Sequence, residues 1–143
     1  MKIKADKYTD DFVQIAETVV AYKLRAAWLE MSKMYNTIAG AHGATMSMGF
    51  TLLAIYEPEG TPVTQIAPRM GMEPNSLSRI LKELENRGAI YKRKDEIDKR
   101  KVYICLTDHG KEIRKVAFKA VFNLNNELIK DISPEKLQIF FEV

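Results

Sequence analysis

The sequence predicts a mainly α-helical fold with a small β-hairpin wing, in which a winged helix-turn-helix is flanked by N- and C-terminal helices. Apolar residues recur at helical spacing over most of the 143 residues. Gly71 separates two short helical segments, and two β-rich segments with a charged tip between them follow. A helix-turn-helix followed by a basic hairpin has a shape that fits duplex DNA.

The N-terminal segment, residues 9–39, is predicted to form one long helix because no proline interrupts its apolar stripe. A helix of about 30 residues would be about 45 Å long, more than the core of so small a domain can cover. We therefore expect a homodimer, in which this helix packs with those of residues 107–143, begun by Thr107 and by Ser133-Pro134. The alternative is a monomer with an unusually long exposed helix. The expected interface residues are Phe12, Ile15, Val19, Ile129, Leu137, Phe140 and Phe141.

Residues 45–106 are predicted to form the winged helix-turn-helix. Thr45 fits the N-cap of its first helix and Thr64 that of the next, because threonine hydroxyls accept hydrogen bonds from first-turn amides. Pro74 suits the first position of the third helix, which Gly88 ends. The expected helices cover about residues 47–56, 65–70 and 74–87, and the expected strands cover 89–93 and 101–106.

The helix after Pro74 is predicted to read DNA. Its apolar face, formed by Leu77, Ile80, Leu81 and Leu84, should pack inward. The opposite face is polar and basic, and asparagine and arginine are side chains that bond adenine and guanine edges. An ordinary solvated face would explain this polarity, but not the basic hairpin that follows. The predicted contacts are Asn75, Ser76, Ser78, Arg79 and Lys82, with Ser76 near a phosphate.

The tip of the hairpin is the second predicted contact with DNA. Residues 69–101 hold ten lysines and arginines against six acids, whereas the whole chain has a formal net charge of only +3. Cations gathered there suit phosphates, and a narrow minor groove attracts arginine. We expect Asp98 to brace the wing and orient Arg100 through a charge-assisted hydrogen bond. The predicted contacts of the wing are Arg93, Lys94, Asp98, Lys99 and Arg100.

Three motifs, LE-x-x-G, D-x-R and LT-x-x-G, occur in the order and spacing that make the chain resemble the MarR family of bacterial transcription regulators. The resemblance covers nearly all of residues 1–143 as a single domain, and it implies a homodimer on a pseudo-palindromic operator with Arg100 in the minor groove. It also implies repression, relieved by a small lipophilic or aromatic acid or by thiol oxidation. Pro68 departs from the pattern and should shorten or distort its helix. The motif residues are Leu84, Glu85, Gly88, Arg93, Asp98, Lys99, Arg100, Leu106, Thr107 and Gly110.

Methionines and aromatic residues gather between the end of the long helix and the DNA-reading part. In the family that the chain resembles, effectors bind at this junction. Methionine suits adaptable apolar pockets. The alternative is ordinary core packing. The predicted effector pocket consists of Trp28, Met31, Tyr35, Met46, Phe50 and Met70.

Other functions find less support. No Gly-rich phosphate loop, nucleophile elbow or HExxH motif is present, so we expect neither an enzyme nor a cofactor. No membrane span or signal segment is visible, and we expect a cytoplasmic protein. Redox-sensing relatives carry their cysteine near the N-terminus, so Cys105 is assigned to packing. Two alternatives stay open: a winged helix that binds protein instead of DNA, and a metal-responsive regulator using His42 or His109, although no metal site is predicted.

Overall fold

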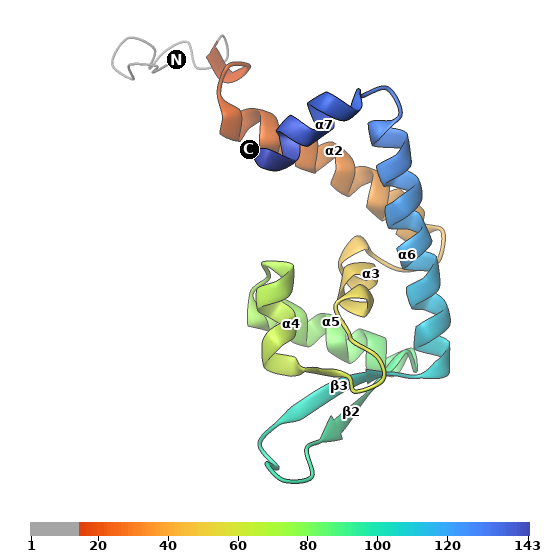
Figure 1. Cartoon of the computed structure of the whole chain (residues 1–143). Helices are drawn as coiled ribbons and strands as arrows, with labels where there is room; N and C mark the ends of the chain where they lie inside the picture. The colour runs from red at the N-terminus through yellow and green to blue at the C-terminus, as the bar shows by residue number, and fades with distance from the viewer. Residues whose placement is uncertain (1–14) are drawn as a thin grey trace.

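The computed structural model describes residues 15–143 as two groups of elements joined by one long helix (Figure 1). That helix, α6, spans Asp108–Ile129. One of its ends meets α2 (Val20–Gly40) and α7 (Pro134–Glu142), and the other meets a winged helix-turn-helix (Figure 1). The predicted fold class is thus confirmed. None of the described helices is long and apolar enough to cross a lipid bilayer.

The N-terminal helix is shorter than predicted. Residues 9–14, with Phe12 among them, lie outside the described part of the chain, and α2 begins only at Val20 because the backbone is extended at Val19 (φ −91°, ψ 117°). The Thr18 hydroxyl donates to a carbonyl of the preceding turn at 2.8 Å. A run of three β-branched residues weakens the helix at this point. With 21 residues, α2 is about 32 Å long instead of about 45 Å.

The winged part contains three helices and a three-stranded antiparallel sheet in the order β1-β3-β2. The predicted hairpin is present as β2 and β3. The sequence does not predict β1, because two residues carry no alternating pattern. The helices are α3 (Met46–Leu53), α4 (Val63–Met70) and α5 (Pro74–Asn86). The strands are β1 (Thr61–Pro62), β2 (Ile90–Lys94) and β3 (Val102–Leu106).

One apolar core holds the winged part together. Leu77, Leu81 and Leu84 are at most 4% exposed, and Ile80 is half-buried, so the predicted inner face of α5 is confirmed. Ile104 meets them from β3 in the same core. Burying each such side chain stabilises the fold by about 1.5–3 kcal/mol relative to leaving it exposed. The core therefore fixes α5 with its polar face outward.

The predicted helix N-caps are correct at three places and wrong at one. Thr45, Thr107 and Ser133 each accept a hydrogen bond from a first-turn amide of α3, α6 and α7. Thr64 is not a cap, because α4 begins at Val63, directly after β1. The expected shortening of α4 by its internal proline is not seen, since the helix continues through it to the end of its eight residues.

The start of α6 is joined closely to the start of the hairpin. The Thr107 amide donates to the Ala89 carbonyl at 3.1 Å, and the Thr107 hydroxyl donates to the Gly88 carbonyl at 2.6 Å. Gly110, in the first turn of α6, lies against Ala89, and a β-carbon at this position would overlap the Ala89 carbonyl. The threonine and glycine of the LT-x-x-G motif thus fix α6 to the winged part.

Candidate nucleic-acid interface and adjoining cavity

The outer face of α5 exposes every residue predicted to contact DNA from this helix. Their side chains face solvent because the leucines of the opposite face hold α5 against the core. The Ser78 hydroxyl donates to the Pro74 carbonyl at 3.1 Å, so it is partly occupied within the helix. The ion pairs among the described residues include neither Arg79 nor Lys82, which leaves both cations available to phosphates or bases. The exposed set is Asn75, Ser76, Ser78, Arg79 and Lys82.

An aspartate that is absent from the predicted contacts folds the tip of the wing, which projects from the body between β2 and β3 (Figure 1). Asp95 Oδ1 accepts the amide of Ile97 at 3.0 Å and that of Asp98 at 2.8 Å. These bonds favour the carboxylate, and they hold the pKa of Asp95 below its ordinary value. Aspartate at the start of a turn is itself a signal for such bonding.

Asp98 orients Arg100, as predicted. Asp98 Oδ1 accepts the Arg100 amide at 3.1 Å and the Arg100 Nε at 3.2 Å. Because the Arg100 side chain is 94% exposed, this ion pair adds little to stability, and its main effect is on the direction of the guanidinium. Lys94 and Lys99 are exposed beside it, and neither forms an ion pair within residues 15–143.

Arg93 differs from Arg100 because its guanidinium is bonded to the loop before β1 and not to the tip of the wing. Arg93 Nη2 donates to the Glu59 carbonyl at 2.7 Å, and the guanidinium carbon lies 4.8 Å from the centroid of the Tyr103 ring. Cys105 packs beside them, 3% exposed, with its Sγ 3.9 Å from the same carbonyl. Arg93 therefore ties β2 to the loop before β1, and Cys105 is a packed core residue of the same strand pair.

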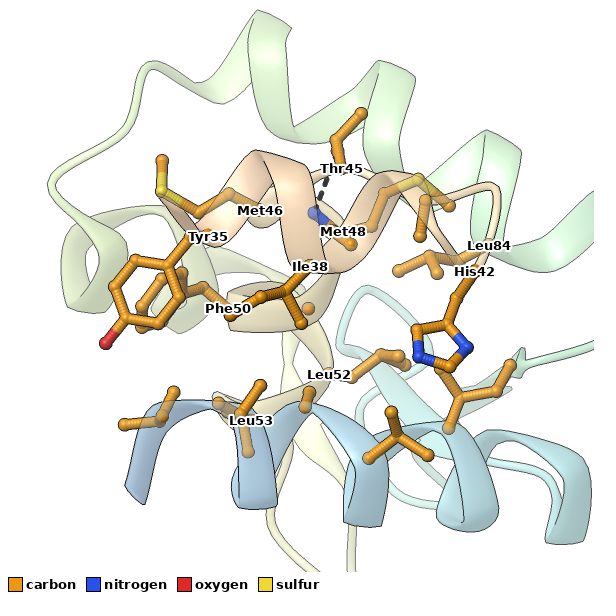
Figure 2. Close-up of a pocket in the computed structure, with 18 of the residues that line it drawn as sticks. Tyr35, Ile38, His42, Thr45, Met46, Met48, Phe50, Leu52, Leu53 and Leu84 are labelled. Carbon is orange, nitrogen blue, oxygen red and sulfur yellow. Dashed lines mark hydrogen bonds between the residues drawn. The ribbon is translucent and has the colours of Figure 1, made fainter. Parts of the chain in front are cut away.

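A cavity of about 520 Å³ lies where the winged part meets α2 and α6. Figure 2 shows it between α3 and α6, with Tyr35 and Phe50 at one end and His42 at the other. The Tyr35 and Phe50 rings meet edge to face, with centroids 5.2 Å apart. Burial raises the pKa of Tyr35 above its ordinary value, because a charged phenolate would lose hydration in this apolar setting. This volume is in the range of small-molecule sites.

The structure brings half of the predicted effector pocket to this cavity. Tyr35, Met46 and Phe50 line it. Trp28 and Met31 do not, because they lie one to two turns earlier on α2, and two turns are about 11 Å along a helix axis. The sulfur of Met70 instead accepts the Thr51 hydroxyl at 3.4 Å in the winged core.

One wall of the cavity and three of its polar lining residues could not be predicted from the sequence. The wall is a face of α6 whose residues recur every three or four positions, a pattern present in the sequence but without any sign of what it would pack against. His42, Arg87 and His109 are polar residues of the lining, and they come from the α2–α3 loop, the end of α5 and the start of α6. Within residues 15–143, no group of three or more metal-binding side chains is close enough to hold a metal ion. The residues of the wall are Ile113, Val116, Ala117, Ala120 and Val121.

A small winged helix with an exposed basic face places the molecule in the class of winged-helix regulators that bind DNA. Residues 45–102 match the MarR family model. Over these residues the chain is similar to the MarR family.

The curated relatives are named as transcriptional regulators. The regulator TtmR of Methylorubrum extorquens is 29% identical over 104 residues, which cover 73% of this chain but only about half (53%) of TtmR. The organic hydroperoxide resistance transcriptional regulator of Bacillus subtilis is 28% identical over 71% of this chain and 69% of its own length.

Solved structures share the fold. A Staphylococcus aureus MepR–DNA complex superposes with a TM-score of 0.78 at 24% identity, covering 87% of this chain and 92% of MepR. CouR of Rhodococcus jostii, bound to p-coumaroyl-CoA, has a TM-score of 0.79 at 20% identity, covering 89% of this chain and 90% of CouR.

Proposed function

We propose that the protein is a homodimeric repressor in the cytoplasm that binds a pseudo-palindromic operator and leaves it when a small lipophilic or aromatic acid binds. The observation that carries the proposal is the exposed face of α5 in the same winged part as a wing whose Arg100 is held by Asp98. Base-reading side chains on a helix and an oriented arginine on a hairpin suit a major and a minor groove respectively. A neighbour of the same fold, MepR, is solved on DNA.

The helical end supports the dimer. Apolar side chains of α2, α6 and α7 face solvent in the single chain, and monomeric proteins rarely leave so many together. A second copy related by a two-fold axis would cover them and would place two α5 helices on successive half-sites. Among the predicted interface residues, Ile129 and Leu137 are half-buried and Phe140 and Phe141 exposed. The exposed apolar residues include Leu24, Trp28, Phe118, Phe122, Ile139, Phe140 and Phe141.

The cavity supports an effector. It lies between the helices proposed to form the dimer and the part proposed to read DNA, and Tyr35, Phe50 and the α6 face give it apolar walls. A ligand there changes DNA affinity only if it binds better to an arrangement of the molecule that does not fit the operator. Repression follows if the operator overlaps a promoter.

Selection of bound sequences from random duplex DNA tests the proposal. We expect a palindromic consensus, and affinity that falls steeply with salt because phosphates are neutralised. With Arg79→Ala the consensus should relax at one or two positions per half-site, whereas Lys82→Ala should weaken all sequences alike. Absence of any selected consensus, with binding insensitive to salt, would instead favour the alternative in which the winged helix binds a protein.

A further inference from the structure

We propose that Arg87 recognises the acid group of the effector, and that it gives up a hydrogen bond to Gly43 in doing so. This inference rests on the proposed function, because it assigns a recognition residue and a signal to the same cavity. It concerns three parts of the chain that the cavity brings together: the end of α5, the loop between α2 and α3, and the first turn of α6.

Arg87 lies at the junction between the reading helix and the cavity. It is the C-cap residue of α5, it lines the cavity, and its side chain is 39% exposed. Its Nε donates to Glu83 Oε1 at 2.7 Å, and its Nη1 donates to the Gly43 carbonyl at 2.7 Å. The guanidinium thus has one ionic partner on its own helix and one neutral partner on another element.

The loop that Arg87 holds joins α2 to α3. On its other side, Asn36 Oδ1 accepts a hydrogen bond from the amide of Met46 at 3.0 Å, so α2 is also bonded to the start of α3. Gly43 turns the loop with φ +63°, a left-handed conformation that favours glycine. The Arg87–Gly43 bond therefore connects the end of the reading helix to the loop that follows α2, the helix with many of the exposed apolar residues.

A ligand carboxylate would compete with Gly43 and not with Glu83. A guanidinium binds a carboxylate more strongly than a neutral carbonyl, because both partners then carry charge. Glu83 lies outside the lining, and none of the residues described as lining the cavity is an aspartate or glutamate, so an acid meets no like charge on the walls. His42 and His109 add hydrogen-bonding groups to the lining of the same cavity.

When a ligand carboxylate takes the place of the Gly43 carbonyl as the partner of Arg87, ligand binding is transmitted to α5. The loop would lose its bond to the reading helix while Arg87 keeps Glu83. Leu84 of α5 also lines the cavity, so an occupant touches the reading helix directly. Binding that favours the arrangement without the Arg87–Gly43 bond then shifts the population away from the one that holds DNA.

Isothermal titration of the full chain with 2-naphthoate and with its neutral analogue 2-naphthamide tests the recognition step. We expect the wild type to prefer the acid by roughly tenfold or more, the value of a hydrogen bond to a charged group. Arg87→Gln should abolish this preference while still binding the amide. Arg69→Gln is the matched control, because Arg69 lies outside the cavity lining, over the Tyr56 ring, and it should keep the preference.

Hydrogen exchange tests the signal. The amides of residues 41–44 are bonded within the loop and the end of α2, and they should exchange faster when naphthoate binds the wild type, but not when it binds Arg87→Gln. An unchanged preference for the acid in Arg87→Gln, no faster exchange in the wild type, or no naphthoate binding by the wild type each overturns the inference. Operator binding by the ligand-free protein is measured separately, so a failure of DNA reading is distinguishable from a failure of Arg87.

Discussion

The two ends of the molecule differ in how completely one chain covers its own apolar side chains. In the winged part, Ile55, Ile66, Leu84 and Ile104 are at most 1% exposed. In α2 and α7 no described residue is buried, and Phe141 is 76% exposed. The winged part thus has a core of its own, whereas the helical end leaves apolar side chains exposed among residues 15–143. DNA reading and assembly are therefore expected to respond differently to mutation.

The largest effect is expected from removing α7. Deleting residues 133–143 should weaken dimerisation while leaving the winged part folded, because the winged core includes no residue of α7. Two linked reading heads raise each other's effective concentration, so a monomer should bind the operator roughly 100-fold or more weakly. Sedimentation and operator titration of the truncated chain measure both effects.

A matched control for the truncation is Lys136→Ala, which alters a polar, exposed position of the same helix. It should leave both dimer and affinity unchanged. A truncated monomer that holds the operator at full affinity would show that the helical end does not serve DNA binding, and the contrast between the two ends would then lose its functional meaning.

A smaller effect, confined to the winged end, is expected from Arg100→Ala. Operator affinity should fall by about 1–3 kcal/mol, with an unchanged melting temperature and an intact dimer, because the side chain is exposed and carries little stability. The operator affinity of Asp98→Asn should lie between that of Arg100→Ala and that of the wild type, because the substitution weakens the bond that orients Arg100 but keeps the cation. Wild-type affinity in Arg100→Ala would refute the placement of the wing on DNA.

The smallest effect is expected from lowering the pH, which should weaken the turn at the tip of the wing. The bound amides lower the folded-state pKa of Asp95 below its ordinary value of 3.8. The stabilisation is therefore fully present above that ordinary value, and it is lost as pH falls through the lowered pKa. The NMR shifts of the Ile97 and Asp98 amides should titrate in this range in the wild type and not in Asp95→Asn. A titration midpoint at or above 3.8 in the wild type would contradict the turn geometry.

The difference between the winged part and the helical end also explains which features could be predicted from the sequence. The winged part follows local rules: the spacing of Leu77, Leu81 and Leu84 gave the inner face of α5, and Thr45 and Thr107 marked helix starts. The break of the N-terminal helix at Val19 was missed because a β-branched run lowers helix propensity only slightly, and a periodic apolar stripe outweighed it. Strand β1 is too short to carry a pattern.

The cavity could be predicted only in part, because it is built by elements far apart in sequence. Tyr35 and Phe50 were predicted from a local cluster of aromatic and methionine residues, and they line the cavity. Trp28 belongs to the same cluster but does not line it. Arg87, His42 and His109 come from three separate elements, and nothing in their local sequence shows that the fold would bring them to one cavity.

The close contact of Gly110 with Ala89 has a geometrical consequence. Because α6 begins in close contact with the hairpin and meets α2 and α7 at its other end, its 22 residues form a lever about 33 Å long between the two groups of elements. A tilt of about 10° at the Thr107 pivot would carry the far end of such a lever about 6 Å. In the proposed dimer, a slight change in the seating of α6 is thus enough to shift one reading helix relative to the other by about 6 Å, which is nearly two base pairs at about 3.4 Å each.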